Sequence, residues 1–335
     1  YINAGADYIS TSTYQVSYDR LQNMGYQSSE IKKVFQKSVD LVKEAIKESE
    51  SKKEIKIVGS FGPFASYDPN ASEYVGKYNS TDDEIKNFHL NNINIIEETD
   101  LDIILYETIP CLREIKILSK ILSQTNKEIW ISITCNENIE FRDGSSFKEA
   151  CKIISPIEQI TTLGINCFSP LLVEKALKKL KKYSNKKTLV YPNSGEKYNP
   201  KDKYWSGKNE FNNLMIKNWL SLSPDIIGGC CRVGYDNIKK MREEIDSLWS
   251  NKMKTSLKEL LFALFAFTLS FSVAYITEIK IVKDAVLIAF LIQWVLFIPA
   301  YIFQTEKFYD LSGSLTYISI VSFCFYNNYE SGNIN

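Results

Sequence analysis

Apolar and polar positions follow two distinct patterns between residue 1 and about residue 248. Short apolar runs are separated by longer stretches in which apolar residues recur every three or four positions. The short runs have the length of buried strands, and the longer stretches have the periodicity of amphipathic helices. We predict seven strands, at residues 6–13, 55–61, 101–107, 129–135, 160–167, 188–192 and 225–230.

The stretches between these strands predict helices at residues 28–48, 81–98 and 111–123. Thr81 or Asp82 is a suitable N-cap for the second of them. Alternating strands and helices are typical of an α/β fold with a parallel sheet, and one more unit would complete a (β/α)₈ TIM-type barrel. Residues 2–10 resemble the end of a helix that leads into a strand, and residue 1 is not methionine. We therefore expect a barrel that lacks its first strand through N-terminal truncation.

The pattern changes after residue 248. Two almost uncharged segments, at residues 260–276 and 285–303, are roughly 17 and 19 residues long, close to the ~20 that span a bilayer. Lys252, Lys254 and Lys258 precede the first segment, which places the preceding domain on the cytoplasmic side. We predict a barrel domain at 1–248, a linker at 249–259 and a helical, membrane-inserting tail at 260–335 that anchors the protein to the lipid bilayer. A pair of buried helices is the alternative.

Composition narrows the kinds of partner. The chain has 40 Lys plus Arg and 40 Asp plus Glu, so its formal net charge is zero and it lacks a basic footprint for nucleic acid. Its seven cysteines are an odd number in scattered, mostly apolar settings, which indicates reduced thiols rather than a disulfide framework. By elimination, a small-molecule partner is favoured.

Polar and small residues collect where the predicted strands end. Such segments occupy residues 11–15, 59–64, 106–110, 135–137 and 191–195. In a barrel the carboxyl ends of all strands form one mouth, where the chemistry takes place. Thr13, Gln15 and Ser60 lie in the first two segments and are candidate substrate contacts. The loop at residues 65–80 is a candidate lid over this mouth.

Three cysteines lie just where apolar strands stop. Cys230 and Cys231 follow Gly228 and Gly229, and Cys167 ends an earlier strand. Consecutive residues of a regular strand point to opposite faces, but glycines allow the backbone to turn so that both thiols face one metal ion. Three thiolates at zinc leave one tetrahedral position open for a substrate thiol. Cysteines are also common in apolar cores, and the spacing alone leaves that alternative open.

Two further titratable residues require interpretation. Glu107 ends an apolar strand, where a carboxylate needs a cation or hydrogen-bond donors. A substrate ammonium group would serve, and so would a structural partner such as Arg113. His89, the only histidine, lies in a predicted outer helix. We interpret it as a surface or packing residue, so we do not expect histidine-based catalysis.

Several strand-end motifs follow one another in a fixed order across residues 1 to about 248. They are Gly5-Ala-Asp-Tyr-Ile-Ser-Thr-Ser-Thr-Tyr-Gln15, Gly59-Ser-Phe-Gly-Pro63, Glu107-Thr-Ile-Pro110, Arg142-Asp-Gly144, Gly164-Ile-Asn-Cys167, Tyr191-Pro-Asn-Ser-Gly195 and Gly228-Gly-Cys-Cys-Arg232. Together they resemble the homocysteine S-methyltransferases. The resemblance implies a (β/α)₈ barrel with Zn²⁺ held by Cys167, Cys230 and Cys231, and it assigns the homocysteine amino group to Glu107. It also implies methyl transfer from S-methylmethionine, a methyl sulfonium, or from S-adenosylmethionine, to homocysteine, which gives methionine.

Two features depart from that family. Its members carry an Asp-Gly-Gly turn after a first strand, which this chain lacks, so we expect the chain as given to be inactive or weakly active. The run at residues 306–316 is instead similar to the opening of a membrane protein family related to steroid reductases. A non-catalytic, membrane-anchored binding protein built on a degenerate barrel is the alternative function. A phosphate-handling barrel would need an anion cradle where this chain carries thiols.

Overall fold

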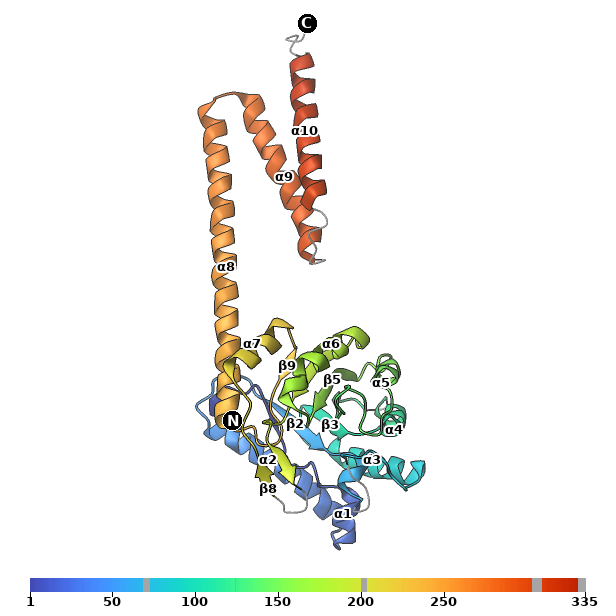
Figure 1. Cartoon of the computed structure of the whole chain (residues 1–335). Coiled ribbons are helices and arrows are strands. Elements are labelled where there is room, and N and C mark those ends of the chain that lie inside the picture. The colour runs from blue at the N-terminus through green and yellow to red at the C-terminus, as the bar shows by residue number, and fades with distance from the viewer. Residues whose placement is uncertain (69–72, 124, 200–203, 303–308, 331–335) are drawn as a thin grey trace. The chain divides into compact units, whose positions relative to one another are not determined.

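The structure is a computed structural model that describes residues 1–68, 73–123, 125–199, 204–302 and 309–330 (Figure 1). The chain divides into two compact units, Tyr1–Ser247 and Leu248–Asn335. The first holds the sheet and its surrounding helices, and the second consists of helices.

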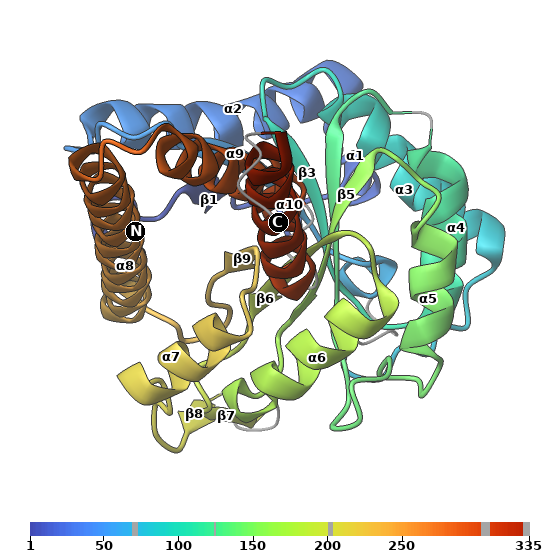
Figure 2. The ribbon, with the colours of Figure 1, turned by 90° about the horizontal axis from the view of Figure 1, so that it is seen from above.

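A seven-stranded parallel sheet forms the centre of the first unit, in the order β1-β2-β3-β4-β5-β6-β9. The strands are β1 (Tyr8–Ser10), β2 (Lys56–Phe61), β3 (Ile103–Ile109), β4 (Glu128–Ile133), β5 (Ile160–Asn166), β6 (Lys187–Tyr191) and β9 (Ile226–Ile227). A separate antiparallel pair, β7 (Lys197–Asn199) and β8 (Tyr204–Ser206), lies between β6 and β9 in the sequence. Each of the seven strands predicted from the sequence is present, and the α/β class is confirmed. The sheet curls as an open, TIM-like barrel (Figure 2).

Helices cover the outer face of this sheet (Figure 2). They are α1 (Tyr18–Asn23), α2 (Ser28–Glu48), α3 (Asp82–Ile96), α4 (Leu112–Leu122), α5 (Phe147–Ile154), α6 (Val173–Tyr183) and α7 (Asn213–Ser221). Of the two predicted N-cap residues of α3, Thr81 is the one observed, and it forms a capping box with Glu84. The Thr81 side chain accepts from the Glu84 backbone N–H, and the Glu84 carboxylate accepts from the Thr81 N–H. Helix α2 has the predicted bounds because Ile31, Phe35 and Val39 bury one face.

The two faces of the sheet have separate cores. The larger core joins the outer face to the helices, and it includes Ile104 and Tyr106 of β3. A smaller cluster contains strand residues alone and includes Ile103 and Leu105, so it fills the concave face. Because strand residues alternate, the next residue on this inner face of β3 is Glu107. The inner face therefore changes from apolar to polar at the carboxyl ends of the strands.

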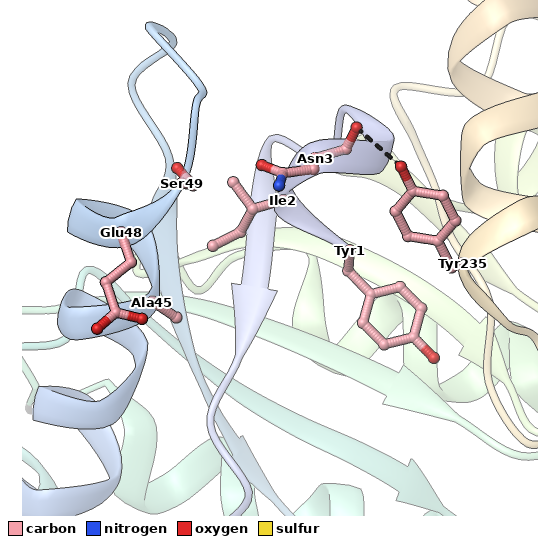
Figure 3. Close-up of a pocket in the computed structure, with 7 residues that line it drawn as sticks. All are labelled: Tyr1, Ile2, Asn3, Ala45, Glu48, Ser49 and Tyr235. Atoms are coloured by element: carbon pink, nitrogen blue, oxygen red, sulfur yellow. Dashed lines mark hydrogen bonds between the residues drawn. The ribbon is translucent and has the colours of Figure 1, made fainter.

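The strands β1 and β9 are the two edges of the sheet, so the ring of strands is open. Side chains connect the two sides of this opening. The Tyr1 hydroxyl donates to the Val233 carbonyl, and the Tyr235 hydroxyl donates to the Asn3 carbonyl, each at 3.3 Å. A hollow of about 330 Å³ lies beside these contacts, and it is lined by Tyr1, Ile2, Asn3, Ala45, Glu48, Ser49 and Tyr235 (Figure 3). None of the lining residues is a cysteine, so this hollow is not the predicted metal site.

The second unit is helical. It contains most of α8 (Tyr235–Ile276), together with α9 (Lys280–Ile302) and α10 (Tyr309–Glu330). The predicted linker at 249–259 lies within α8. Residues 303–308 lie outside the described residues. They include the last residue of the second predicted span and the start of the 306–316 run that resembles the membrane protein family related to steroid reductases.

The predicted membrane-inserting tail requires correction. Within the described part of the chain, no helix combines the length and the apolarity needed to cross a membrane. Local apolarity therefore predicted helices in this region correctly, whereas the predicted membrane spans find no support in the described residues.

Candidate metal centre

Three thiols converge at the carboxyl end of the sheet. Cys167 directly follows β5, and Cys230 and Cys231 follow β9 after two glycines. The three sulfur atoms all lie within 4.8 Å of one another, and the Cys167 and Cys231 sulfurs are 3.8 Å apart. Cys167 is buried, and the other two are half-buried. The structure thus brings together the three cysteines that the sequence singled out.

A sharp corner after β9 allows two adjacent cysteines to face one point. The strand ends at Ile227, so Cys230 and Cys231 are free of the alternation that a regular strand imposes. A Cβ atom at Gly229 would lie 2.0 Å from Cγ1 of Val233, so this corner has no room for another side chain. The Cys230 N–H donates to the Pro192 carbonyl at 2.8 Å, which ties the corner to the segment after β6.

The donor set fits a thiophilic metal ion. Hydrogen bonds with Cys167 and Cys230 lower the pKa of the Cys231 thiol, whereas hydrogen bonds with the other two thiols raise the pKa of Cys230. One thiolate is therefore already favoured among the three sulfurs. A divalent cation would favour deprotonation of all three, because its charge stabilises thiolate ligands. Three such sulfurs are a suitable set for zinc, with one position left for a further ligand.

Glu107 lies at the same mouth, at the end of the inner face of β3. Its carboxylate accepts hydrogen bonds from Ser60 Oγ, from the Tyr191 hydroxyl at 3.0 Å and from Asn166 Nδ2 at 3.4 Å. Burial raises the pKa of this carboxyl group above its usual value. The proposed structural partner Arg113 instead pairs with Asp82. Neutral donors hold the Glu107 carboxylate, so it can still pair with a cationic ligand.

The other predicted substrate contacts have different surroundings. Ser60 is buried and donates to Glu107, as described above. The Thr13 hydroxyl is buried and donates to the Ser60 carbonyl at 2.7 Å, so it connects the end of β1 to β2. Gln15 is exposed in the loop after β1. Only Ser60 among these three directly contacts Glu107 in the described structure.

Asn166 was given no role of its own in the sequence analysis, although it lies in one of the strand-end motifs. It is fully buried directly before Cys167. Its Oδ1 accepts from the Thr108 N–H at 3.0 Å and from Ser132 Oγ at 2.9 Å, and its Nδ2 lies 4.0 Å from the Cys230 sulfur. Asn166 therefore connects the carboxylate side of the site to the thiol side. The sequence signal for a role of Asn166 in the site is its polar amide side chain at the end of an otherwise apolar strand, directly before the candidate metal ligand Cys167.

Comparisons with known proteins point to one family. The profile of the homocysteine S-methyltransferase family matches residues 1–245. Homocysteine S-methyltransferase YbgG of Bacillus subtilis (strain 168) is 31% identical over 266 residues, covering 76% of this chain and 83% of the relative. Selenocysteine Se-methyltransferase of Brassica oleracea var. italica is 30% identical, covering 76% and 81%.

A solved structure shares the fold. The metallated form of the homocysteine methyltransferase MmuM from Escherichia coli superposes with a TM-score of 0.63 at 24% identity. The match covers 72% of this chain and 81% of that one. The family profile and the curated relatives together extend over nearly all of the first unit. This chain belongs to the homocysteine S-methyltransferase family.

Proposed function

We propose that this protein transfers a methyl group from S-methylmethionine to homocysteine, giving methionine, with Zn²⁺ held by Cys167, Cys230 and Cys231. The observation that carries the proposal is the meeting of three thiols and a buried carboxylate at one mouth of the sheet. Family membership supports homocysteine as the acceptor.

The acceptor has groups that match both sides of the site. Homocysteine carries an ammonium group and a thiol. The Glu107 carboxylate would pair with the ammonium group, and the metal ion held by the three cysteines would bind the thiol. A bound Zn²⁺ would supply the positive charge that keeps the acceptor sulfur deprotonated at neutral pH. Ser60 and Tyr191 hold the Glu107 carboxylate in place for this pairing.

The transfer is a displacement at carbon. The acceptor sulfur forms a bond to the methyl carbon, and the bond between that carbon and the donor sulfonium breaks. The electron pair of the broken bond stays with the donor sulfur, which becomes a neutral thioether. With S-methylmethionine as donor, each turnover yields two methionine molecules.

The proposal is tested by a parallel assay of donors. The chain, prepared under reducing conditions with Zn²⁺, is incubated with homocysteine and either S-methylmethionine, S-adenosylmethionine or betaine. We expect the highest kcat/KM with S-methylmethionine. Appearance of S-adenosylhomocysteine at a higher rate would assign the adenosyl donor instead. Zinc-loaded protein that neither binds homocysteine nor forms methionine with any donor would contradict methyl transfer itself, whereas homocysteine binding without turnover would match the weak activity expected of the chain as given.

Substitution Glu107→Gln is expected to raise the KM for homocysteine about 10- to 100-fold, because a hydrogen bond to a charged group contributes about 1.5–3 kcal/mol. Zinc content should remain that of the unaltered protein, since Glu107 is not a sulfur ligand. Glu128→Gln is the matched control, because Glu128 begins β4 and bonds to Trp130 and Thr161 rather than to the site. An unchanged KM in Glu107→Gln would remove Glu107 from substrate binding.

The pH dependence should reflect the raised pKa of Glu107. Only the carboxylate form pairs with an ammonium group, so kcat/KM should fall as pH drops through a value above the ordinary ~4.3 of glutamate. Folding stability should change in the opposite direction. Because the pKa of Glu107 is higher in the folded protein than in the unfolded chain, this group contributes its full stabilisation below the unfolded-state pKa. That contribution is lost as pH rises through the folded-state pKa. In Glu107→Gln the acid-side loss of kcat/KM should move to lower pH, and a pH profile identical to that of the unaltered protein would contradict the assignment.

A further inference from the structure

A second buried polar cluster lies in the helix layer, apart from the three cysteines. Its centre is Glu114 of α4, whose side chain is fully buried. One carboxylate oxygen accepts from the Phe64 backbone N–H and lies 2.7 Å from Nε2 of His89 in α3. The other oxygen accepts from the Tyr78 hydroxyl at 2.7 Å. His89 is therefore a packing residue with no exposed surface.

The contacts of Glu114 fix both sides of one loop. Phe64 begins a short 3₁₀ helix, Phe64–Ser66, soon after β2, and Tyr78 lies near the end of the loop. Burying a carboxylate is costly unless both of its oxygens accept hydrogen bonds. The bonds from Phe64 and Tyr78 to Glu114 therefore hold the loop in one position on α4. Gly76 completes the fit: it has a φ of 72°, and a Cβ atom there would lie 2.6 Å from the Pro110 carbonyl oxygen. Residues 69–72 of this predicted lid lie outside the described residues.

Between these anchors, Tyr74 reaches the candidate metal centre. Its hydroxyl lies 4.0 Å from the Cys167 sulfur. The Arg142 guanidinium lies 5.8 Å from the centre of the Tyr74 ring, and it also donates to the Cys167 carbonyl at 3.2 Å. The loop therefore places an O–H donor beside one of the three sulfurs.

We propose that Glu114 is a positioning residue of the metal centre, which acts by fixing the loop that holds the Tyr74 hydroxyl against the Cys167 sulfur. The inference rests on the proposed metal site and extends it to residues that touch neither metal nor substrate. A hydrogen bond donated to a ligand sulfur orients that ligand and spreads its negative charge. Groups that bond to metal ligands in this way change metal affinity about 10- to 100-fold.

The test measures Zn²⁺ affinity of the whole chain by competition with a chelator. Tyr74→Phe should weaken the affinity about 10-fold. Tyr78→Phe should weaken it by a smaller factor, because it loosens the loop rather than removing the donor. In the Tyr74→Phe background, Tyr78→Phe should have no further effect, since its influence passes through Tyr74. Tyr18→Phe is the control, because that hydroxyl bonds to Ser28 on the surface.

Each other outcome overturns the inference. Additive losses in the double variant would show that Tyr78 acts independently of Tyr74. A lower Tm of Tyr78→Phe with unchanged Zn²⁺ affinity would leave the cluster a structural role alone. If Tyr78→Phe does not fold, Glu114→Gln tests the same connection with a side chain of equal size. Unaltered protein that binds no Zn²⁺ would refute the proposed function as well, whereas normal Zn²⁺ binding by all variants would refute this inference alone.

Discussion

Replacing Cys167 with serine should abolish tight Zn²⁺ binding and lower methyl transfer by more than about 100-fold. Substituting a residue that only hydrogen-bonds to a metal ligand costs about 10- to 100-fold, and loss of a ligand itself should cost more. A serine hydroxyl stays protonated at neutral pH and is a poor zinc ligand compared with a thiolate. The two remaining sulfurs belong to the adjacent residues Cys230 and Cys231, so the ligand that follows β5 is lost. Metal content per chain and methionine formation are the measurements.

Cys135→Ser provides the matched control. Cys135 is also buried and also follows a central strand, β4, but it does not belong to the group of three sulfurs. Burial raises the pKa of its thiol to about 12, so it remains protonated at neutral pH. We expect Cys135→Ser to keep its zinc. Normal zinc content in Cys167→Ser would contradict the proposed ligand set.

Gly229→Ala should have the second largest effect, with loss of the metal and a destabilisation of about 1–3 kcal/mol, typical of overpacking. The added Cβ would lie 2.0 Å from Cγ1 and 2.4 Å from Cβ of Val233, so the corner that carries Cys230 and Cys231 would have to move. Thermal unfolding and metal content measure the two consequences separately.

Gly234→Ala tests whether the effect is local. Gly234 lies after the same corner, and a Cβ there would meet no atom within 4 Å. The two substitutions therefore add the same methyl group, one into contact with Val233 and one into open space. Full metal content in Gly229→Ala would show that the corner can relax without displacing its thiols.

Local patterns were sufficient for most of the fold. The helix at Ser28–Glu48 was predicted from its apolar spacing, and the start of α3 from an N-cap at Thr81 or Asp82, because both signals act within a few residues. The edge strands are shorter than predicted. Strand β1 covers Tyr8–Ser10 and β9 only Ile226–Ile227, since each pairs with one neighbour and β9 is followed by two glycines.

The candidate site was predictable only in part. The cysteines could be found because each follows a recognisable strand, and strand ends meet at one edge of a parallel sheet. The partners of Glu107 could not, because Ser60 and Tyr191 lie 47 and 84 residues away from it in the sequence. The connection from Glu114 to Phe64 likewise spans 50 residues. Such pairs depend on strand register and helix packing, which no local pattern determines.

The short edge strand β9 gives the metal centre a mechanical consequence. Two backbone pairs with β6 hold this strand, whereas Cys167 extends from β5 inside the sheet. An ion shared by Cys167 and Cys231 would join positions 64 residues apart and cross-link a weakly held edge to a firmly held interior strand. Opening of that edge would then require release of the ion, so the amide protons of β9 should exchange more slowly when the metal is bound.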